Sequence, residues 1–116
     1  MSEIKIPFNE WSKTRLLFKR CTSRNRKYGE VGDTFVCNYE SIITGDERII
    51  KYQITHIEKV TLGFVAEHLY KLEGASLPEE FIKVWEDIHP VIGFVPTQKV
   101  WVHVFKEIEK QKKEVK

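Results

Sequence analysis

The order of strand-like and helix-like patterns along the chain most constrains its fold. Residues 48–60 alternate between two faces as a hairpin strand does, and residues 99–105 place valines on one face and rings on the other. Between these segments lie two stretches whose apolar residues recur at helical spacing. Because strands and helices do not alternate regularly along the chain, a mainly antiparallel sheet is indicated. We therefore predict an α+β fold, in which a small curled sheet or β-barrel carries short helices packed around it.

The N-terminal part is predicted to add one helix and one strand. Asn9 suits the cap of a short helix over residues 10–18. A polar stretch over residues 21–28 follows. Glycines then favour a turn that leads into a strand over residues 34–39.

Two helices are predicted ahead of the last strand. The first has apolar residues at helical spacing over residues 62–72, and Gly74 lies just after its end, where a positive φ is favoured. Ser76 and Glu79 have the spacing of a capping box that opens the second helix, with a proline in its first turn. The apolar stripe of this helix consists of Phe81, Val84, Trp85 and Ile88. The helix is expected to stop at His89, before a proline.

Length and composition fit one domain. The chain has 116 residues and is 41% hydrophobic, which suffices for one core. We predict a single domain over residues 1–108 and a charged tail over residues 109–116, with the last strand ending at Phe105 and the residues after it frayed. The first residues hold no long apolar run, so neither a signal peptide nor a membrane span is expected, and we predict a cytoplasmic protein. Cys21 and Cys37 are expected to stay reduced there.

Charge is distributed unevenly along the chain. Residues 11–29 contain seven basic residues and no acidic one, whereas the rest of the chain has a net charge of −5. A positive pole of this kind attracts phosphates or other anions. The alternative is a solvated basic helix and turn without a ligand.

No pattern in the sequence indicates a metal or a cofactor. The four histidines lack the H-x-x-x-H or C-x-x-C companions of a metal site, and no Walker loop, G-x-G-x-x-G or G-x-S-x-G occurs. We predict no metal and no cofactor. His103, between Trp101 and Phe105, is expected to be a core residue, and His89 to cap a helix.

A short basic stretch has Lys19, Thr22 and Arg24 at a spacing that resembles the signature of the ASCH domain family. That signature reads G-x-K-x-x-[TE]-x-R, and residues 17–24 match its three polar positions with Lys19, Thr22 and Arg24. Leu17 stands in place of the glycine.

A second stretch resembles the helix junction of the same family. Residues 73–81 begin with Glu73 and run on through a Ser, a Pro and two further glutamates. The resemblance covers about residues 11–105, with its motifs in the family's order. It implies a PUA-like β-barrel with a cleft for RNA or a nucleoside-like ligand.

The resemblance also implies an activity. One branch of the family consists of amidohydrolases that remove acetate from acetylcytidine with a lysine, a threonine and a glutamate, which correspond to Lys19, Thr22 and Glu73 here. Amide hydrolysis needs a nucleophile, a base and a proton donor, and these three side chains suit those roles. The residues expected to bind the ligand are Arg20, Arg24, Arg26, Lys27 and Tyr28.

Two other functions and a structural role stay open. A non-catalytic RNA-binding module needs only a basic groove, beside which tyrosines can stack on bases; a ribonuclease is the third candidate. In the structural alternative, Thr22 and Arg24 hydrogen-bond strand ends, and Lys19 with Glu73 forms a salt bridge that closes the barrel mouth. The expected partner is RNA or a modified nucleoside, with no membrane partner, and the protein is expected to be a monomer or weak dimer.

Overall fold

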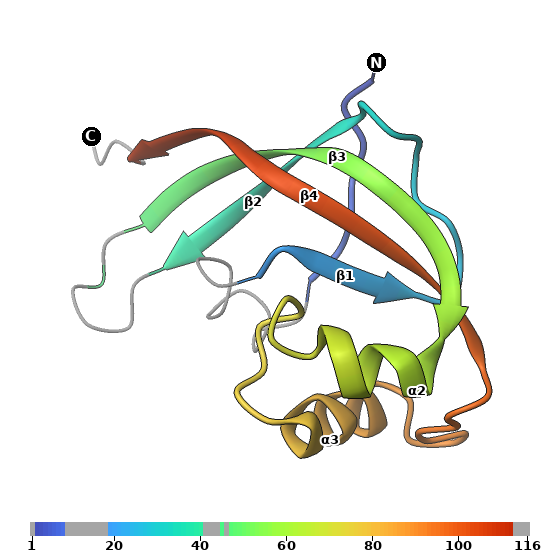
Figure 1. The fold of residues 1–116 in the computed structure, drawn as a ribbon. Helices are drawn as coiled ribbons and strands as arrows, with labels where there is room; N and C mark the ends of the chain where they lie inside the picture. The colour runs from blue at the N-terminus through green and yellow to red at the C-terminus, as the bar shows by residue number, and fades with distance from the viewer. Residues whose placement is uncertain (1, 9–18, 41–44, 46, 113–116) are drawn as a thin grey trace.

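A four-stranded sheet forms the centre of the molecule. The structure is a computed structural model that describes residues 2–8, 19–40, 45 and 47–112. The strand order is β1-β4-β3-β2, and every neighbouring pair is antiparallel (Figure 1). The strands are β1 (Cys21–Arg24), β2 (Thr34–Glu40), β3 (Glu47–Thr61) and β4 (Lys99–Lys112). The predicted α+β fold with a mainly antiparallel sheet is confirmed, whereas the helix predicted over residues 10–18 lies outside the described residues.

The two longest strands give the sheet its curl. β3 and β4 pair along almost their whole length, and their register shifts between Lys51 and Tyr52 and again between Ile54 and His56. Such bulges bend a strand and increase its twist. In Figure 1 the two strands arch over β1, which produces a half-barrel with a concave inner face.

The helices gather at one end of this half-barrel. A short helix, α2 (Leu62–Phe64), continues β3 directly and runs into a π-helical turn, η1 (Val65–Leu69); helix α3 (Pro78–Ile88) follows. The apolar spacing that predicted the first helix is confirmed, because its early apolar positions are buried. Gly74 has a φ of 101°, as its predicted place after the helix end requires.

The start of α3 differs from the predicted capping box by one residue. The cap is Leu77, without a side-chain hydrogen bond, and Pro78 is the first helical residue. Proline fits that position because its missing N–H needs no partner there. Glu80, and not Glu79, reaches back, and its Oε1 accepts the backbone N–H of Ser76 at 2.8 Å.

Two strand boundaries also differ from prediction. β4 does not end at Phe105, since residues 106–112 pair with the first half of β3. The end of β4 is set by main-chain pairing with β3, which the charged side chains of this segment do not reveal. The polar stretch predicted after residue 20 contains β1, an edge strand that pairs with β4 from Cys21 opposite Val104 to Arg24 opposite Trp101. Four residues are too few for a visible alternation.

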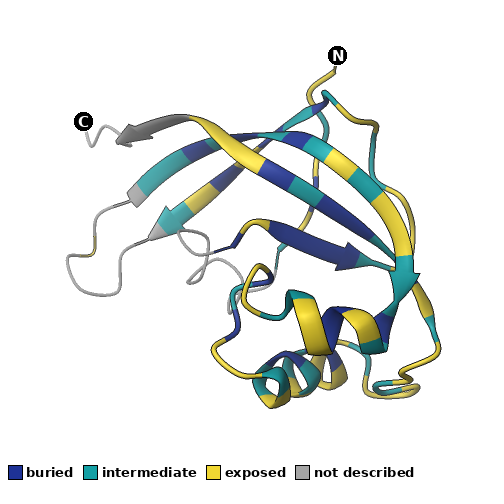
Figure 2. Ribbon diagram, viewed as in Figure 1, coloured by how far each residue is buried: buried dark blue, intermediate teal, exposed yellow. Residues whose placement is uncertain are grey.

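Two apolar clusters make up the core (Figure 2). One lies between the helices and the sheet, and its largest members are Phe81 and Trp85. The other lies inside the curl, where Phe35, Tyr52 and Phe105 pack ring against ring with centroids 4.9–5.4 Å apart. Both cysteines are buried free thiols. No helix in the described part of the chain is long and apolar enough to span a membrane.

The turn that follows the basic segment depends on Gly29. Its φ is +66°, and a Cβ there would lie 2.6 Å from Ile4 Cδ1 and 2.8 Å from Asp33 Oδ2. Gly29→Ala is therefore expected to lower the free energy of unfolding by about 1–2 kcal/mol more than Gly45→Ala does. Gly45 is a matched control, because its φ of +73° carries the same backbone strain and a Cβ there meets nothing within 4 Å. Equal losses in urea titrations of the two variants would contradict this packing argument.

Candidate functional site

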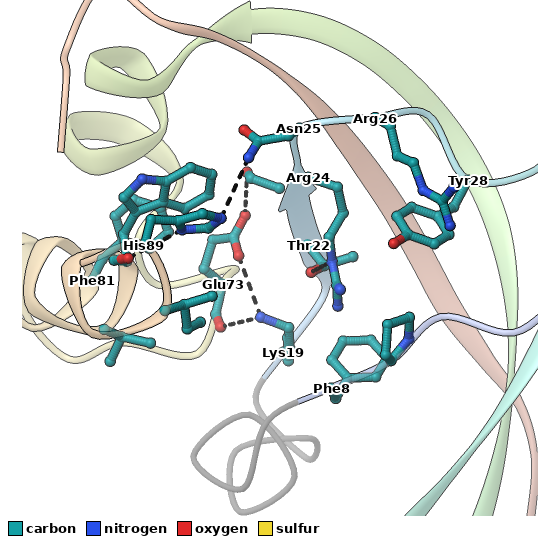
Figure 3. Close-up of a pocket in the computed structure, with 15 residues that line it drawn as sticks. Phe8, Lys19, Thr22, Arg24, Asn25, Arg26, Tyr28, Glu73, Phe81 and His89 are labelled. Carbon is teal, nitrogen blue, oxygen red and sulfur yellow. Dashed lines mark hydrogen bonds and ion pairs between the residues drawn. The ribbon is translucent and has the colours of Figure 1, made fainter. Parts of the chain in front are cut away.

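Most of the predicted site residues line one pocket of about 520 Å³. β1 and the residues flanking it form one wall, and α3 with His89 forms the wall across from it (Figure 3). Both core clusters reach the pocket, since Phe8 packs against one and Trp85 belongs to the other. Its lining comprises Pro7, Phe8, Lys19, Thr22, Ser23, Arg24, Asn25, Arg26, Tyr28, Glu73, Phe81, Val84, Trp85, Ile88 and His89.

Lys19 and Glu73 form a buried ion pair in the pocket wall. Lys19 Nζ lies 3.3 Å from Glu73 Oε1 and donates to the backbone carbonyl of Glu73 at 2.8 Å. The two residues are only 2% and 4% exposed. The main chain holds their segments together, because the amides of Arg20 and Cys21 both donate to the carbonyl of Leu72, at 2.6 and 3.0 Å. Backbone hydrogen bonds between the neighbours of Lys19 and the neighbour of Glu73 therefore hold the two residues close together.

The other carboxylate oxygen of Glu73 accepts hydrogen bonds from side chains of β1. Ser23 Oγ donates to Glu73 Oε2 at 2.6 Å, and the thiol of Cys21 lies 3.6 Å from the same atom. Burial, together with the nearby Glu73 charge, raises the pKa of the Cys21 thiol, which stays protonated and able to donate. The sequence analysis missed Ser23. Only the alternation along β1, which puts it on the same side as Cys21, would have pointed to it.

Thr22 and Arg24 form a second group of contacts at the same pocket. Arg24 Nε donates to Thr22 Oγ1 at 3.1 Å. The guanidinium carbon of Arg24 lies 4.9 Å from the ring centroid of Phe8 and 5.6 Å from that of Tyr28. Burial lowers the pKa of Arg24, which remains charged at neutral pH. Because Thr22 Oγ1 is an acceptor in this contact, its own proton is not used in it.

The buried ring of His103 contacts the backbone of Thr22 and Tyr28. It is 0% exposed, and its Nε2 accepts the backbone N–H of Tyr28 at 2.8 Å. Its Nδ1 lies 3.3 Å from the carbonyl of Thr22 and donates to it in the tautomer that lets Nε2 accept. Burial lowers the pKa of His103, so the ring is neutral. The prediction that His103 is a core residue is confirmed.

The basic residues predicted to bind the ligand lie in different places. Arg24, Arg26 and Tyr28 line the pocket. Lys27 does not line it and instead pairs with Glu30 at 2.8 Å. Arg20 does not line it either, and its Nη1 donates to the carbonyl of Lys19 at 3.0 Å. Counting charges along a segment does not reveal which way each side chain turns.

The wall formed by α3 carries a polar contact that the sequence analysis did not assign to the site. His89 caps α3, as predicted, and its ring stacks on Trp85 with centroids 4.2 Å apart. His89 Nε2 lies 3.4 Å from Asn25 Nδ2, and Asn25 Oδ1 accepts from Gln98 Nε2 at 2.7 Å. These contacts join the end of α3 to the end of β1 at the pocket. Among the described residues, no group of three His, Cys, Asp or Glu side chains is placed to hold a metal ion.

Comparisons with known proteins identify the fold. No protein-family model and no curated protein matches the sequence. Among solved structures, the chain is similar to an ASCH domain from Lactobacillus crispatus JV V101, at 16% identity and a TM-score of 0.54, over 91% of this chain and 78% of that one. It is also similar to a protein of the DUF984 family from Enterococcus faecalis V583, at 14% identity and a TM-score of 0.56, over 92% and 75%. The chain therefore has an ASCH-like fold, as its motifs predicted.

Proposed function

Starting from this ASCH-like fold, we propose that the pocket binds a modified nucleoside, free or within RNA, and hydrolyses an acyl group from a cytidine-type amine. The observation that carries the proposal is the buried Lys19–Glu73 pair, which lies with the hydroxyl of Thr22 in one pocket. Burying an ion pair is costly unless its charges are compensated, and such sites are commonly functional. Substrate class and roles rest on the sequence resemblance together with this pocket.

The size and lining of the pocket support a nucleoside-sized ligand. Its volume of about 520 Å³ lies within the ~300–1,000 Å³ typical of small-molecule sites. Aromatic side chains occur on both walls, with Phe8 and Tyr28 on one and Trp85 on the other. A planar base between such walls gains stacking and apolar burial.

The contact between Lys19 and Glu73 supplies a route to both a base and an acid. If a proton passes from the ammonium to the carboxylate across the 3.3 Å contact, the pair becomes a neutral amine and a carboxylic acid. The amine then accepts a proton from the nucleophile, and the acid donates one to the leaving nitrogen.

The proposed reaction has two stages. Thr22 Oγ attacks the acyl carbon while its proton moves to Lys19; the C–N bond then breaks, and Glu73 protonates the departing amine of the base. Water next attacks the acyl ester on Thr22 and gives up its proton to Glu73, and the threonine oxygen leaves with the proton held by Lys19. Acetate and the free amine are the products, and the enzyme returns to its starting state.

The test is release of acetate from acetylcytidine by the purified protein. We expect turnover by the unmodified protein and only background release by Thr22→Val, which keeps the shape of the side chain and removes the nucleophile. Ser23→Ala is the matched control, because it removes the neighbouring hydroxyl on the same strand. Activity in Ser23→Ala should fall by about ten- to a hundredfold, the cost of one hydrogen bond to a charged group, and should stay above background.

Two outcomes count against this mechanism. Absence of turnover by the folded, unmodified protein would overturn the hydrolase proposal. Background release in Ser23→Ala combined with activity in Thr22→Val would transfer the role of nucleophile to Ser23. Circular dichroism of each variant separates loss of activity from loss of fold.

A further inference from the structure

We propose that Arg24 and Arg26, together at the ring of Tyr28, form a phosphate subsite beside the pocket, so that the preferred ligand is a phosphorylated nucleoside and not a neutral one. This inference rests on the proposed function and specifies its substrate class. A free nucleotide and a nucleotide within RNA present the same chemistry to such a subsite.

The two arginines converge on one ring. The guanidinium carbon of Arg26 lies 4.6 Å from the centroid of Tyr28, and that of Arg24 lies 5.6 Å from it. All three residues line the pocket, and Figure 3 shows both arginines reaching the tyrosine from the same chain segment. The backbone of Tyr28 is fixed in turn by its hydrogen bond to His103. Both cationic groups therefore contact one aromatic ring, whose residue is anchored through its backbone.

The pocket has more positive than negative charge. Among the residues that the structure describes, its lining contains three cations, Lys19, Arg24 and Arg26, and one carboxylate, that of Glu73. Lys19 compensates Glu73, which leaves two guanidinium groups. Within the part of the chain that the structure describes, neither is in an ion pair with a carboxylate. Two like charges at one ring repel each other, and an anion bound at this ring would reduce that cost.

Partial burial of Arg24 adds to this preference. Its guanidinium lies against Phe8 and Tyr28 and has lost part of its hydration, as its lowered pKa indicates. A cation in such a setting gains most from a ligand that is both charged and able to accept several hydrogen bonds. Phosphate matches the fork of a guanidinium better than a single hydroxyl of a sugar does. The geometry therefore favours the charged ligand.

Calorimetric titration with matched ligand pairs tests the inference. Acetylcytidine is compared with its 5′-monophosphate, and cytidine with cytidine 5′-monophosphate, which examines the phosphate apart from the acyl group. We expect each monophosphate to bind at least about tenfold more tightly than its nucleoside, as one charged hydrogen bond would give. This advantage should shrink when salt is raised from 50 to 200 mM. A short RNA with an internal acetylcytidine separates a phosphodiester in RNA from a free phosphate.

The neighbouring basic residues provide a matched pair of variants. Arg26→Ala should abolish most of the advantage in affinity of the monophosphate over the nucleoside. Lys27→Ala removes the same charge one residue further along, at a side chain that pairs with Glu30 and does not line the pocket. Lys27→Ala should keep the advantage. Arg26 and Lys27 are both exposed, so neither change is expected to unfold the protein.

The outcomes separate this inference from the proposed function. Equal affinities for nucleoside and monophosphate would overturn the phosphate subsite, even with acetate release intact. If Arg26→Ala and Lys27→Ala reduce the advantage of the monophosphate equally, the phosphate is attracted by the basic surface in general and not bound in a subsite. Absence of acetate release, with the monophosphates still bound preferentially, would refute the hydrolase and keep the subsite. Absence of binding by every ligand would refute both.

Discussion

Replacing Lys19 by methionine is expected to lower the free energy of unfolding by about 3–5 kcal/mol, the usual cost of removing one partner of a buried ion pair. The variant leaves the Glu73 carboxylate 4% exposed and without its countercharge. Ser23 and Cys21 still donate to that carboxylate, which places the expected loss toward the lower end of the range. Urea denaturation followed by circular dichroism measures it, provided that the m-value stays unchanged.

A double variant shows whether the loss comes from the unpaired charge. Lys19→Met combined with Glu73→Met replaces the pair by apolar groups, so it should be more stable than Lys19→Met alone, because no buried charge remains uncompensated. Lys83→Met, at an exposed position on α3, is the control for the substitution itself and should change stability by less than about 0.5 kcal/mol. If the effects of the two single substitutions simply add, the ion pair is not what stabilises this wall of the pocket.

Removal of the His103 imidazole is expected to lower stability by roughly 2–4 kcal/mol. His103→Leu fills a similar space, but it leaves the Tyr28 N–H without its acceptor and the Thr22 carbonyl without this donor. Since both residues line the pocket, the variant should also weaken ligand binding. Thermal and urea unfolding at pH 7.5 measure the first effect, and titration with acetylcytidine measures the second.

His103 should also make stability depend on pH in the mildly acidic range. Burial lowers its pKa below the ordinary 6.5, so below about pH 6.5 the unfolded chain binds a proton that the folded protein does not. The contribution of His103 to stability is complete above that pH. It decreases as the pH falls toward the lower pKa of His103 in the folded state. The stability gap between the unmodified protein and His103→Leu should therefore narrow from pH 7.5 to pH 5. A constant gap between the unmodified protein and His103→Leu would show that protonation of His103 is not linked to folding.

How far the fold could be predicted depended on the kind of signal. β2 and β3 were predictable because their side chains alternate over enough residues to be recognised. β1 and the distal half of β4 were not, because main-chain pairing with distant strands defines them. The cap of α3 was displaced by one residue because proline, and not serine, sets where the helix begins.

The same distinction applies to the site. Lys19, Thr22 and Glu73 were proposed from a resemblance to a family, and all three line the pocket. Ser23 and Asn25 were missed, because their importance arises only when β1 meets the turn before α3 and the end of α3 itself. Arg20 and Lys27 were included on charge alone, and their side chains turn elsewhere.

The carbonyl of Leu72, which accepts two amides from the start of β1, has a consequence for how this protein can change over generations. Main-chain groups are present whatever the side chain, so most substitutions at Arg20, Cys21 or Leu72 leave this junction in place. Substitutions that accumulate in the neighbouring sequence therefore need not separate Lys19 from Glu73, which this junction holds together at the pocket. A chain built in this way can lose most of its identity to its relatives and still keep the distance on which its chemistry depends.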